Sequence, residues 1–364
     1  MAKKMEKQKD VAPRKVRWAF IGCGRISQAH LSALQQMPQV EIVAGCDILE
    51  ERLEWFHQQP GCEGAYLYQD YRDMLASEEI DAVDVCTPND VHCPAAIAAL
   101  KAGCHVIVEK PMAMSPEECR KMIAASKKAG RLLAVGFQIR YTPEVEMCVK
   151  ARKEGLLGEI LYGKVHAMRR RGVPNWGVFG QKEKQGGGPM IDIGVHMIES
   201  CLYAMGEPKP VAASGMTWTY LGNQPSDIAC KWPGWDWKTY NVEDLAVGQV
   251  RFDNGAILQI ESSFCAHIKE DMAYWEVYGT KGGFDMREAT LYHDQAGVMV
   301  DSKASFLPDH TWPKDFVSKL GNFTDAIQYG TPLRAPGEAG LAVQSIIDAI
   351  YRSAAQGGVE VKIP

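Results

Sequence analysis

The stretch VRWAFIGCGRIS, residues 16–27, decides the fold of the first half of this chain. Its first six residues are mostly apolar, as in a buried parallel strand, and this run stops at Gly22. Residues 26–37 then show the spacing of apolar side chains that is typical of a helix, which Pro38 ends. A strand, a glycine-containing turn and a helix in this order predict the first unit of a parallel α/β sheet.

The same alternation of strands and helices continues to about residue 140. Apolar runs predict further strands at residues 40–46, 81–86, 105–108 and 132–135, and helical spacing predicts helices at residues 50–59, 94–102 and 117–129. Ser115 and Pro116 mark the start of the last helix, as its N-cap and its first residue. Parallel strands joined by right-handed crossovers form a doubly wound Rossmann sheet, so we expect this fold in the first half.

From about residue 158 the pattern becomes that of an open, mostly antiparallel β-sheet in an α/β domain. Strands are predicted at residues 159–168, 211–221, 244–252, 256–264, 274–279 and 283–286, and helices at residues 315–329 and 337–356. Glycine-containing turns at residues 253–255 and 280–283 join two pairs of these strands as hairpins. A chain of 364 residues is too long for one ordinary core, so we expect a disordered lead at residues 1–15, a Rossmann domain at residues 16–140 and a second domain at residues 141–364.

The composition is that of a globular protein and excludes several classes of function. Hydrophobic residues make up 46% and charged residues 23%, and the formal net charge of −5 gives no electrostatic basis for binding nucleic acid or an anionic membrane. The N-terminal residues lack the apolar segment of a secretory signal, and no apolar run is long enough to span a bilayer. The 11 cysteines include no CxxC pair and no histidine–cysteine cluster of the zinc type, so we expect a reduced, cytoplasmic protein without disulfides or a metal site.

The polar residues that follow the predicted parallel strands indicate a dinucleotide site, because such sheets bind ligands at the carboxyl ends of their strands. Gly22 and Gly24 allow a tight turn and let backbone N–H groups approach a pyrophosphate at a helix N-terminus. Asp47, at the end of the second strand, is placed to accept hydrogen bonds from the adenosine ribose hydroxyls. Neither Ile48 nor Leu49 would screen this carboxylate from a 2′-phosphate, so NAD is favoured over NADP.

Three motifs together resemble those of the Gfo/Idh/MocA oxidoreductase family. They are GCGRIS at residues 22–27, EKP at residues 109–111 and GGGPMIDIGVH at residues 186–196, and TPN at residues 87–89 with His92 is similar to a fourth pattern of the family. The resemblance extends from residue 16 to the end of the chain, where the family folds the helix predicted at residues 337–356 back near the nucleotide domain. It implies hydride exchange with a nicotinamide, and oligomer contacts through the open antiparallel sheet.

The resemblance also implies a role for each residue of a catalytic set. Lys110 matches the family's lysine beside the nicotinamide and the reacting hydroxyl, and Asp192 and His196 match its D-x-x-x-H pair, whose side chains point the same way in a helix. Oxidation of an alcohol removes a hydride from carbon and a proton from oxygen. A histidine, with an ordinary pKa near ~6–7, suits the proton, a lysine stabilises the developing alkoxide, and a carboxylate holds the substrate. Whether Lys110 or His196 accepts the proton first is open at this point.

Two sets of side chains are predicted to line the site. The residues expected to bind the cofactor are Gly22, Gly24, Arg25, Ile26, Asp47, Thr87, Pro88, Asn89, His92, Glu109, Lys110 and Gln138. The residues expected to bind the substrate are Lys110, Arg140, Tyr141, Trp176, Asp192 and His196. Of the three arginines at residues 169–171, alternation along a strand leaves at most two that face the cleft. The tryptophan-rich loop at residues 231–237 serves either the substrate or a subunit contact.

The chemistry and the resemblance predict an NAD-dependent dehydrogenase that acts on a secondary hydroxyl of a sugar, a glycoside or a cyclitol. The segment at residues 170–196 resembles that of family members which oxidise glycosides at the C3 hydroxyl, so this hydroxyl of a glucoside is favoured. Two alternatives stay open: a glycosidase that uses bound NAD for redox-elimination, and a non-catalytic NAD-binding regulator. The expected partners are a small carbohydrate and other copies of the chain, with neither nucleic acid nor a membrane.

Overall fold

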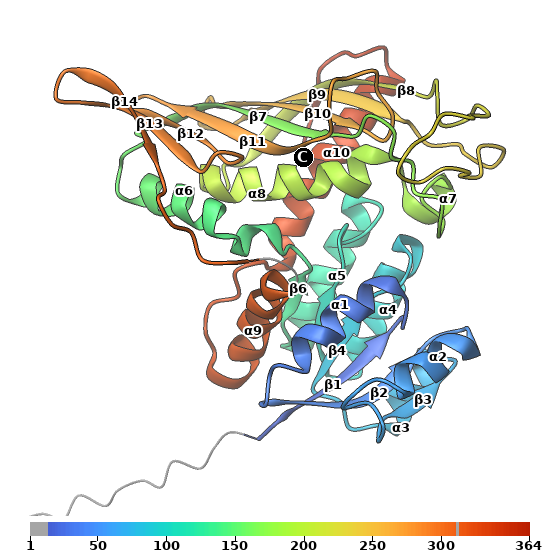
Figure 1. Ribbon diagram of the computed structural model, residues 1–364. Coiled ribbons are helices and arrows are strands. Elements are labelled where there is room, and N and C mark those ends of the chain that lie inside the picture. The colour runs from blue at the N-terminus through green and yellow to red at the C-terminus, as the bar shows by residue number, and fades with distance from the viewer. Residues whose placement is uncertain (1–13, 311–312) are drawn as a thin grey trace, which may run out of the picture.

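The computed structural model describes residues 14–310 and 313–364, and two sheets organise them (Figure 1). The first sheet has six strands in the order β3-β2-β1-β4-β5-β6, and every neighbouring pair is parallel. Its strands are β1 (Val16–Ile21), β2 (Val40–Cys46), β3 (Tyr66–Tyr68), β4 (Ala82–Val85), β5 (His105–Val108) and β6 (Leu133–Val135). The strand order reverses between β1 and β4, so the carboxyl ends of these two strands border the crevice in which such sheets bind ligands.

The predicted Rossmann fold of the first half is therefore confirmed. Its crossover helices are α1 (Arg25–Leu34), α2 (Glu50–His57), α3 (Tyr71–Ser77), α4 (Asn89–Lys101) and α5 (Pro116–Ala129). The sequence pattern does not predict β3 or α3, because elements of three and seven residues are too short to show a clear periodicity. Helix α4 begins five residues before its predicted start, and Pro94 removes one backbone hydrogen bond inside this helix without ending it.

The second sheet has nine strands in the order β14-β13-β12-β11-β7-β10-β9-β8-β15. They are β7 (Ile160–Met168), β8 (Pro210–Trp218), β9 (Leu245–Phe252), β10 (Ile257–Ser263), β11 (Met272–Gly279), β12 (Gly282–Asp285), β13 (Thr290–Gln295), β14 (Val298–Lys303) and β15 (Val361–Lys362). Only the central pair of β7 and β10 is parallel among these described strands, so the prediction of a mostly antiparallel sheet is confirmed. The sequence pattern does not predict the β13–β14 hairpin, whose residues are largely exposed and therefore lack an apolar alternation.

Within the part of the chain that the structure describes, helices cover one face of the second sheet and leave the other open (Figure 1). The helices of this half are α6 (Pro143–Lys153), α7 (Lys182–Gln185), α8 (Val195–Met205), α9 (Lys314–Tyr329) and α10 (Gly337–Ala355). In Figure 1, α6 and α8 lie between this sheet and the first half, and α8 packs against β7 and β11. Gly163 and Val165 of β7 are buried, whereas the alternate residues Tyr162 and Lys164 are partly exposed on the opposite, open face.

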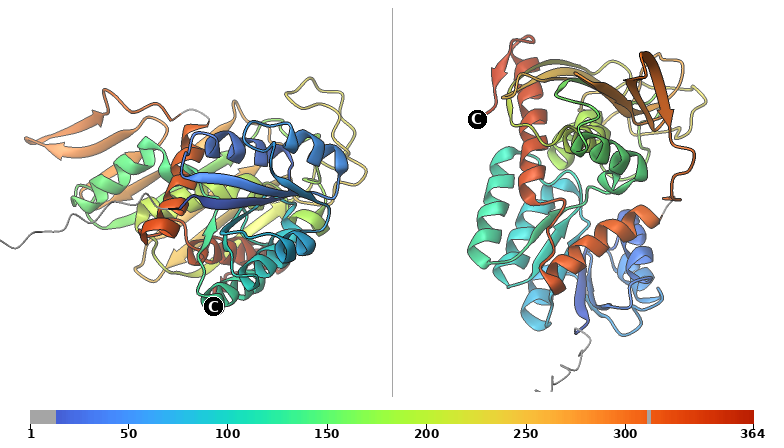
Figure 2. Two further views of the ribbon diagram at one scale, coloured as in Figure 1. Left: turned by 90° about the horizontal axis from the view of Figure 1, so that it is seen from below. Right: turned by 90° about the vertical axis from the view of Figure 1, so that its left-hand side faces the viewer.

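The chain returns to the first half after the second sheet. Helix α9 packs against α1, and the N–H of Val135 in β6 donates a hydrogen bond of 2.9 Å to the carbonyl of Ala335. Helix α10 then packs against α5 and β6 at one end and against β8 at the other, and the right-hand view of Figure 2 shows it, in red, running between the two halves. The predicted division between residues 140 and 141 stays a prediction.

Three further expectations concern the whole chain. Of the predicted lead at residues 1–15, residues 1–13 lie outside the described residues, and Arg14 donates a hydrogen bond of 2.7 Å to Asp81. All 11 cysteines are free, and only Cys230 among them is not fully buried. Across residues 14–310 and 313–364, none of the helices combines the length and the hydrophobicity that crossing a bilayer requires.

The turn between β1 and α1 explains its two glycines differently. Gly22 has a φ of +95°, and a Cβ at this residue would lie 2.6 Å from the carbonyl oxygen of Cys86 after β4. Gly24 has an ordinary φ of −83°, and no atom lies within 4 Å of the Cβ that would be added there. Only Gly22 is therefore required by the fold, and Gly24 leaves open space at the N-terminus of α1.

We expect Gly22→Ala to lower the free energy of unfolding by about 2 kcal/mol or more, because it adds left-handed backbone strain and a clash with main chain. Gly24→Ala is the matched control and should change this free energy by no more than ~0.5 kcal/mol. Urea denaturation followed by circular dichroism measures both values. Equal stability of the two variants would contradict this account of the turn.

Candidate active site

The glycine loop and Asp47 form one end of the candidate site. Gly24 is the N-cap of α1, no side chain caps this helix, and the space that a Cβ at Gly24 would occupy is open. Asp47 follows β2, and its carboxylate accepts hydrogen bonds from the N–H of Cys23 at 2.9 Å and of Leu49 at 3.0 Å. The structure therefore brings an anion-binding helix end and the predicted ribose-binding carboxylate together.

The segment after β4 is held by contacts within the protein. The two ring nitrogens of His92 lie 2.8 Å from the carbonyl oxygen of Pro111 and 2.9 Å from that of Thr87. Burial lowers the pKa of His92 despite these two acceptors. The amide of Asn89 donates to the backbone and side-chain oxygens of Gln185, at 3.0 and 2.7 Å. His92 and Asn89 were both predicted to bind the cofactor. In the structure they connect the loops around the site instead, and the ring nitrogens of His92 and the amide N–H groups of Asn89 are already engaged within the protein.

Lys110 and Asp192 join the two halves at the centre of the candidate site. Lys110 follows β5, and its Nζ donates hydrogen bonds to Oδ1 and to the backbone carbonyl of Asp192, each at 2.9 Å. Asp192 lies in a π-helical turn, Met190–Gly194, that leads directly into α8. Burial alone would raise the pKa of Asp192, but the positive charges of Lys110 and Arg169 outweigh burial and hold this pKa below its ordinary value.

The glycine run before Asp192 is explained by the buried Glu243 and the partly buried Tyr351 of the second half. A Cβ at Gly187 would clash with the hydroxyl of Tyr351 in α10, and a Cβ at Gly188 would clash with the backbone of Glu243. The Glu243 carboxylate accepts hydrogen bonds from the N–H of Gly188 at 2.8 Å and of Met190 at 3.2 Å, and from the Tyr351 hydroxyl at 2.7 Å. No sequence motif marks Glu243 or Tyr351, so the sequence analysis did not identify either residue.

His196 lies in the first turn of α8, four residues after Asp192, and is half-buried. Its Nδ1 has no hydrogen-bond partner among the described residues, and Asp192 pairs with Lys110 instead. Burial and then the charge of Lys110 lower the pKa of His196 to about 3. The expected titration near ~6–7 is therefore corrected, because that value belongs to a solvated imidazole. His196 is neutral at physiological pH and can accept a proton.

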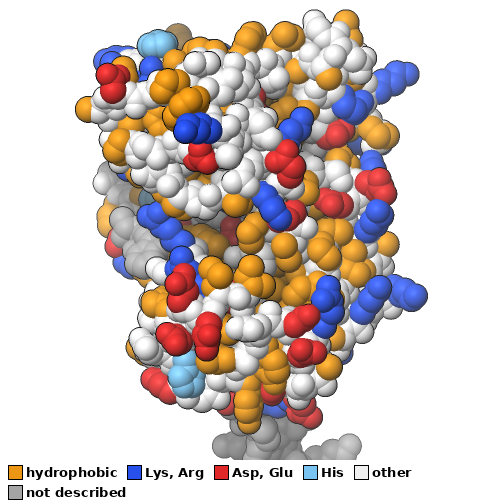
Figure 3. Space-filling model, turned by 90° about the vertical axis from the view of Figure 1, so that its right-hand side faces the viewer, with side chains coloured by type: hydrophobic (Ala, Val, Ile, Leu, Met, Phe, Trp, Pro, Cys, Tyr) orange, Lys and Arg blue, Asp and Glu red, His pale blue; other side chains and the backbone are white. Residues whose placement is uncertain are grey.

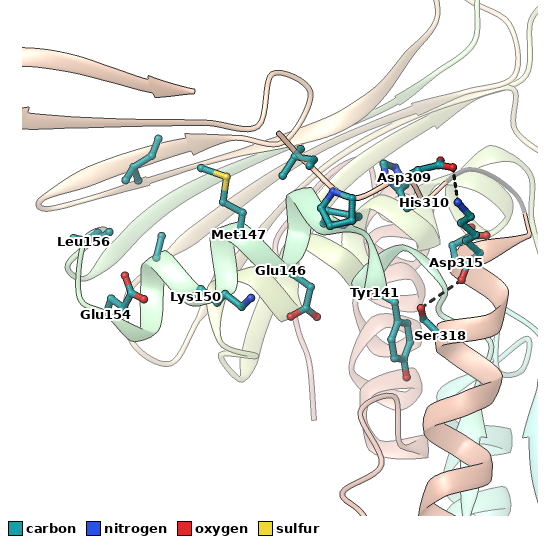
Figure 4. Close-up of a pocket in the computed structure, with 16 residues that line it drawn as sticks. Tyr141, Glu146, Met147, Lys150, Glu154, Leu156, Asp309, His310, Asp315 and Ser318 are labelled. Carbon is teal, nitrogen blue, oxygen red and sulfur yellow. Dashed lines mark hydrogen bonds and ion pairs between the residues drawn. The ribbon is translucent and has the colours of Figure 1, made fainter. Parts of the chain in front are cut away.

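Two predicted substrate residues point away from the site. Arg140 is only 1% exposed and donates to Glu199 in α8 at 2.6 Å, so it forms a buried ion pair. The hydroxyl of Tyr141 donates to Asn322 in α9 at 3.1 Å. Tyr141 also lines a separate cavity of about 610 Å³ between α6 and α9, where Figure 4 shows its ring pointing along α9. Both predictions are wrong, because the short helix Ile139–Tyr141 turns these side chains away from the strand end.

The prediction that Glu109 binds the cofactor is also corrected. One carboxylate oxygen lies 2.9 Å from Nζ of Lys319 in α9, and the other accepts the N–H of Lys110 at 3.1 Å. Glu109 is 4% exposed and faces the interior of the first half. It follows that the EKP motif contributes Lys110 to the site and keeps Glu109 inside the protein.

Two tryptophan rings lie between two arginines along one side of the site. The guanidinium of Arg25, beside the glycine loop, lies 4.6 Å from the ring centroid of Trp176. Trp176 packs edge-on against Trp232 at 4.8 Å, and Arg169 lies 5.0 Å from the Trp232 ring. Of the three arginines at residues 169–171, it is Arg169 whose charge reaches Asp192 in the described structure. Figure 3 shows that the face carrying α7 is hollowed at mid-height, between the two halves.

Comparison with known proteins gives a consistent result across the chain. A family model described as an oxidoreductase family with an NAD-binding Rossmann fold matches residues 16–137, and the corresponding C-terminal alpha/beta domain matches residues 150–363. D-glucoside 3-dehydrogenase of Escherichia coli (strain K12) is 34% identical, over 94% of this chain and 96% of the relative. Levoglucosan dehydrogenase of Pseudarthrobacter phenanthrenivorans is 28% identical, over 93% and 95%. A solved structure of levoglucosan dehydrogenase in complex with NADH has a TM-score of 0.84 and 25% identity, over 96% of this chain and 100% of that one.

We expect Lys110→Met to raise the pKa of His196, because the variant loses a cation that opposes protonation and keeps the Asp192 carboxylate that favours it. NMR titration of the histidine ring signals measures this pKa, and His196→Asn assigns the signal.

In the unaltered protein the His196 ring should stay neutral as the pH falls from 8 to about 5, because its pKa is about 3. An unaltered His196 that titrates between pH ~6 and ~7 would contradict the burial argument.

Proposed function

The chain belongs to the Gfo/Idh/MocA oxidoreductase family, and from this premise we propose that it oxidises the C3 hydroxyl of a D-glucoside with NAD. The observation that carries the proposal is the pair of Lys110 and Asp192 at 2.9 Å, beside a neutral His196 and near a glycine loop that fits a dinucleotide. The more general activity, a dehydrogenase acting on a carbohydrate hydroxyl, agrees with the relatives named above. D-glucosides are favoured over cyclitols, because the myo-inositol 2-dehydrogenase of Thermotoga maritima is 28% identical and the D-glucoside enzyme is 34% identical.

The residues of the first half fit NAD. Open space at Gly24 leaves the N-terminus of α1 accessible to a pyrophosphate, and Asp47 lies beside this loop for the ribose. Buried Oγ1 of Thr87 and Oε1 of Gln138 have no hydrogen-bond partner among the described residues, as is expected where a bound ligand completes the contacts. When bound, NAD supplies the nicotinamide that accepts the hydride.

We propose that Lys110 and His196 divide the work on the substrate hydroxyl. Two of the three N–H donors of Lys110 engage Asp192, and the third is directed to the substrate oxygen, where the ammonium stabilises the charge that develops as the O–H bond breaks. We assign that proton to His196, because its Nδ1 has no hydrogen-bond partner among the described residues, whereas the Lys110 ammonium would first have to lose a proton. The electron pair of the C–H bond leaves as the hydride, and the C–O bond becomes a carbonyl.

Two other functions were left open by the sequence. A redox-elimination glycosidase would use the same C3 oxidation, followed by removal of the C2 proton and loss of the aglycone. A non-catalytic regulator would bind NAD without needing Lys110, Asp192 and His196 together. The dehydrogenase is favoured because these three side chains are brought together and because the relatives are named dehydrogenases.

We further propose that copies of the chain assemble through the open face of the second sheet, in the reducing cytoplasm. The rings of Tyr162 in β7 and Tyr278 in β11 stack on this face with centroids 5.6 Å apart, and Nζ of Lys164 lies 5.6 Å from the Tyr278 ring. Aromatic side chains of this kind are enriched at protein interfaces. Sedimentation velocity measures this assembly. The free cysteines fit the reducing cytoplasm that we propose.

The proposed function is tested by following NADH absorbance with a panel of D-glucosides, free glucose and myo-inositol. We expect NADH to accumulate with a D-glucoside, and Lys110→Met to lose most of this turnover while it still binds NAD. Release of the aglycone without net NADH would indicate redox-elimination instead. Binding of NAD without turnover on any member of the panel would favour the regulator.

We expect Asp47→Ala to shift the preference from NAD toward NADP. The variant loses the hydrogen bonds to the ribose hydroxyls and the repulsion of a 2′-phosphate, and a charged hydrogen bond alone is worth about 1.5–3 kcal/mol, or roughly tenfold or more in the ratio of kcat/KM values. Asp47→Asn is the matched control, since it keeps an acceptor for the Cys23 N–H without the charge. A ratio that does not change in Asp47→Ala would remove Asp47 from the ribose site.

A further inference from the structure

A cluster of polar side chains lies buried below the turn that carries Lys110. Its members come from α1, from β4 and the residue after it, from the residue after β5 and from α9, and each is at most 6% exposed: His30, Asp84, Cys86, Glu109 and Lys319. Lys319 is 1% exposed, and a lysine is almost never buried to this extent unless its charge is paired. The proposed oxidation of the substrate hydroxyl uses none of these side chains directly.

Every oxygen of the Glu109 carboxylate is engaged. Oε1 lies 2.9 Å from Nζ of Lys319 and 2.9 Å from Nε2 of His30, while Oε2 accepts the backbone N–H of Lys110 at 3.1 Å. The space around this carboxylate is tight, because a Cβ at Gly136 would clash with it. The backbone between Glu109 and Lys110 is therefore tied to a side chain whose position Lys319 and His30 determine.

His30 extends the cluster to the neighbouring strand. Its Nδ1 lies 2.6 Å from the carboxylate of Asp84 in β4, so one imidazole connects β4 with the end of β5. The strand ends of β4 and β5 carry the segments that begin at Thr87 and at Lys110. The cluster thus supports both segments from the interior of the protein.

The charges of the cluster explain why it is stable when buried. Asp84 and Glu109 supply two negative charges, and Lys319 supplies one positive charge. Burial alone would lower the pKa of His30, but its contacts with Asp84 and Glu109 outweigh burial and the nearby Lys319 ammonium and raise this pKa. Removal of the Lys319 ammonium would leave an uncompensated charge in a dry interior.

Part of this cluster has the residue types of a metal site. Ligand atoms of His30, Asp84 and Cys86 lie within 4.8 Å of one another. The donor atoms are engaged within the protein, however: the Cys86 thiol donates to Asp84 at 3.3 Å, and the ring nitrogens of His30 lie 2.6 Å from Asp84 and 2.9 Å from Glu109. The cluster is explained better by its own hydrogen bonds and ion pairs.

We propose that Lys319 is a positioning residue for Lys110: through Glu109, helix α9 fixes the turn that presents the Lys110 ammonium to Asp192 and to the substrate. The proposal rests on the proposed function for the role of Lys110. Its physical basis is that a charged group in an active site loses effect steeply when it is displaced, by as much as roughly 10²-fold in rate for ~1 Å. Lys319 is 210 residues from Glu109 in the sequence, so only the return of α9 to the first half creates this contact.

The test compares Lys319→Met with a matched variant of the same helix. Phe323→Leu weakens the packing of α9, because the Phe323 ring meets Trp18 edge-on at 5.6 Å, and this hydrocarbon side chain has no polar atom to bond Glu109. We expect Lys319→Met to lower kcat by about 10–100-fold with KM and the Kd of NAD within about twofold, since positioning acts in the transition state. Phe323→Leu should lower Tm and keep kcat within about twofold. Lys319→Arg, which keeps the charge, should retain more activity than Lys319→Met.

A double variant tests whether the effect passes through Glu109. In a Glu109→Gln background, Lys319→Met should cost little further activity, because the two residues act as one unit. Losses in kcat that multiply, or a Lys319→Met enzyme as active as Phe323→Leu, would overturn the proposal. If Lys319→Met does not fold, Lys319→Gln takes its place, because a neutral amide keeps a donor for Glu109 without the charge.

Hydrogen exchange gives a measurement that does not depend on turnover. We expect faster exchange in the peptide covering residues 105–115 in Lys319→Met and not in Phe323→Leu, because only the first variant frees the turn at Lys110. Unchanged exchange in Lys319→Met would overturn the proposal. An unaltered protein that shows no NADH production on any substrate would instead refute the proposed function, and the exchange result would still decide the role of Lys319.

Discussion

The ion pair between Lys110 and Asp192 is the contact on which the rest of the site depends. Lys110 comes from the end of β5 in the first sheet, and Asp192 comes from the π-helical turn below the second sheet. Neither half of the molecule contains the site alone, so the position of one half against the other determines the geometry of catalysis. Burial and the same cation lower the pKa of His196, which couples the protonation of this histidine to the pair.

Each half holds its member of this pair with a buried carboxylate. Glu109 accepts the backbone N–H of Lys110 in the first half, and Glu243 accepts the N–H of Gly188 and Met190 ahead of Asp192 in the second. Hydrogen bonds from backbone N–H groups to an ionised carboxylate are among the stronger ones in proteins. Glycines make room for both carboxylates, so the glycine run before Asp192 serves packing against Glu243.

The two arginines Arg140 and Arg169 show how burial separates a structural charge from a charge that acts on the site. Arg140 forms a buried ion pair with Glu199, so its positive charge is compensated inside the protein. Arg169 has only a backbone carbonyl as a close hydrogen-bond acceptor among the described residues, and its charge reaches Asp192. The Trp232 ring lies beside Arg169, and Trp176 packs against Trp232, so aromatic and cationic groups meet next to Asp192.

The sequence by itself predicted the two sheets, apart from β3, β15 and the β13–β14 hairpin, and the glycine loop with Asp47, and its resemblance to the family pointed to Lys110, Asp192 and His196. These follow from local periodicity and from short motifs, which depend on residues close together in the chain. Only the tertiary structure decided that Arg140 and Glu109 face the interior, because their partners, Glu199 and Lys319, lie 59 and 210 residues away. The low pKa of His196 likewise comes from burial between the two halves. The direction of a side chain and the charge that it meets are properties of packing, and packing brings together residues whose relation no local pattern records.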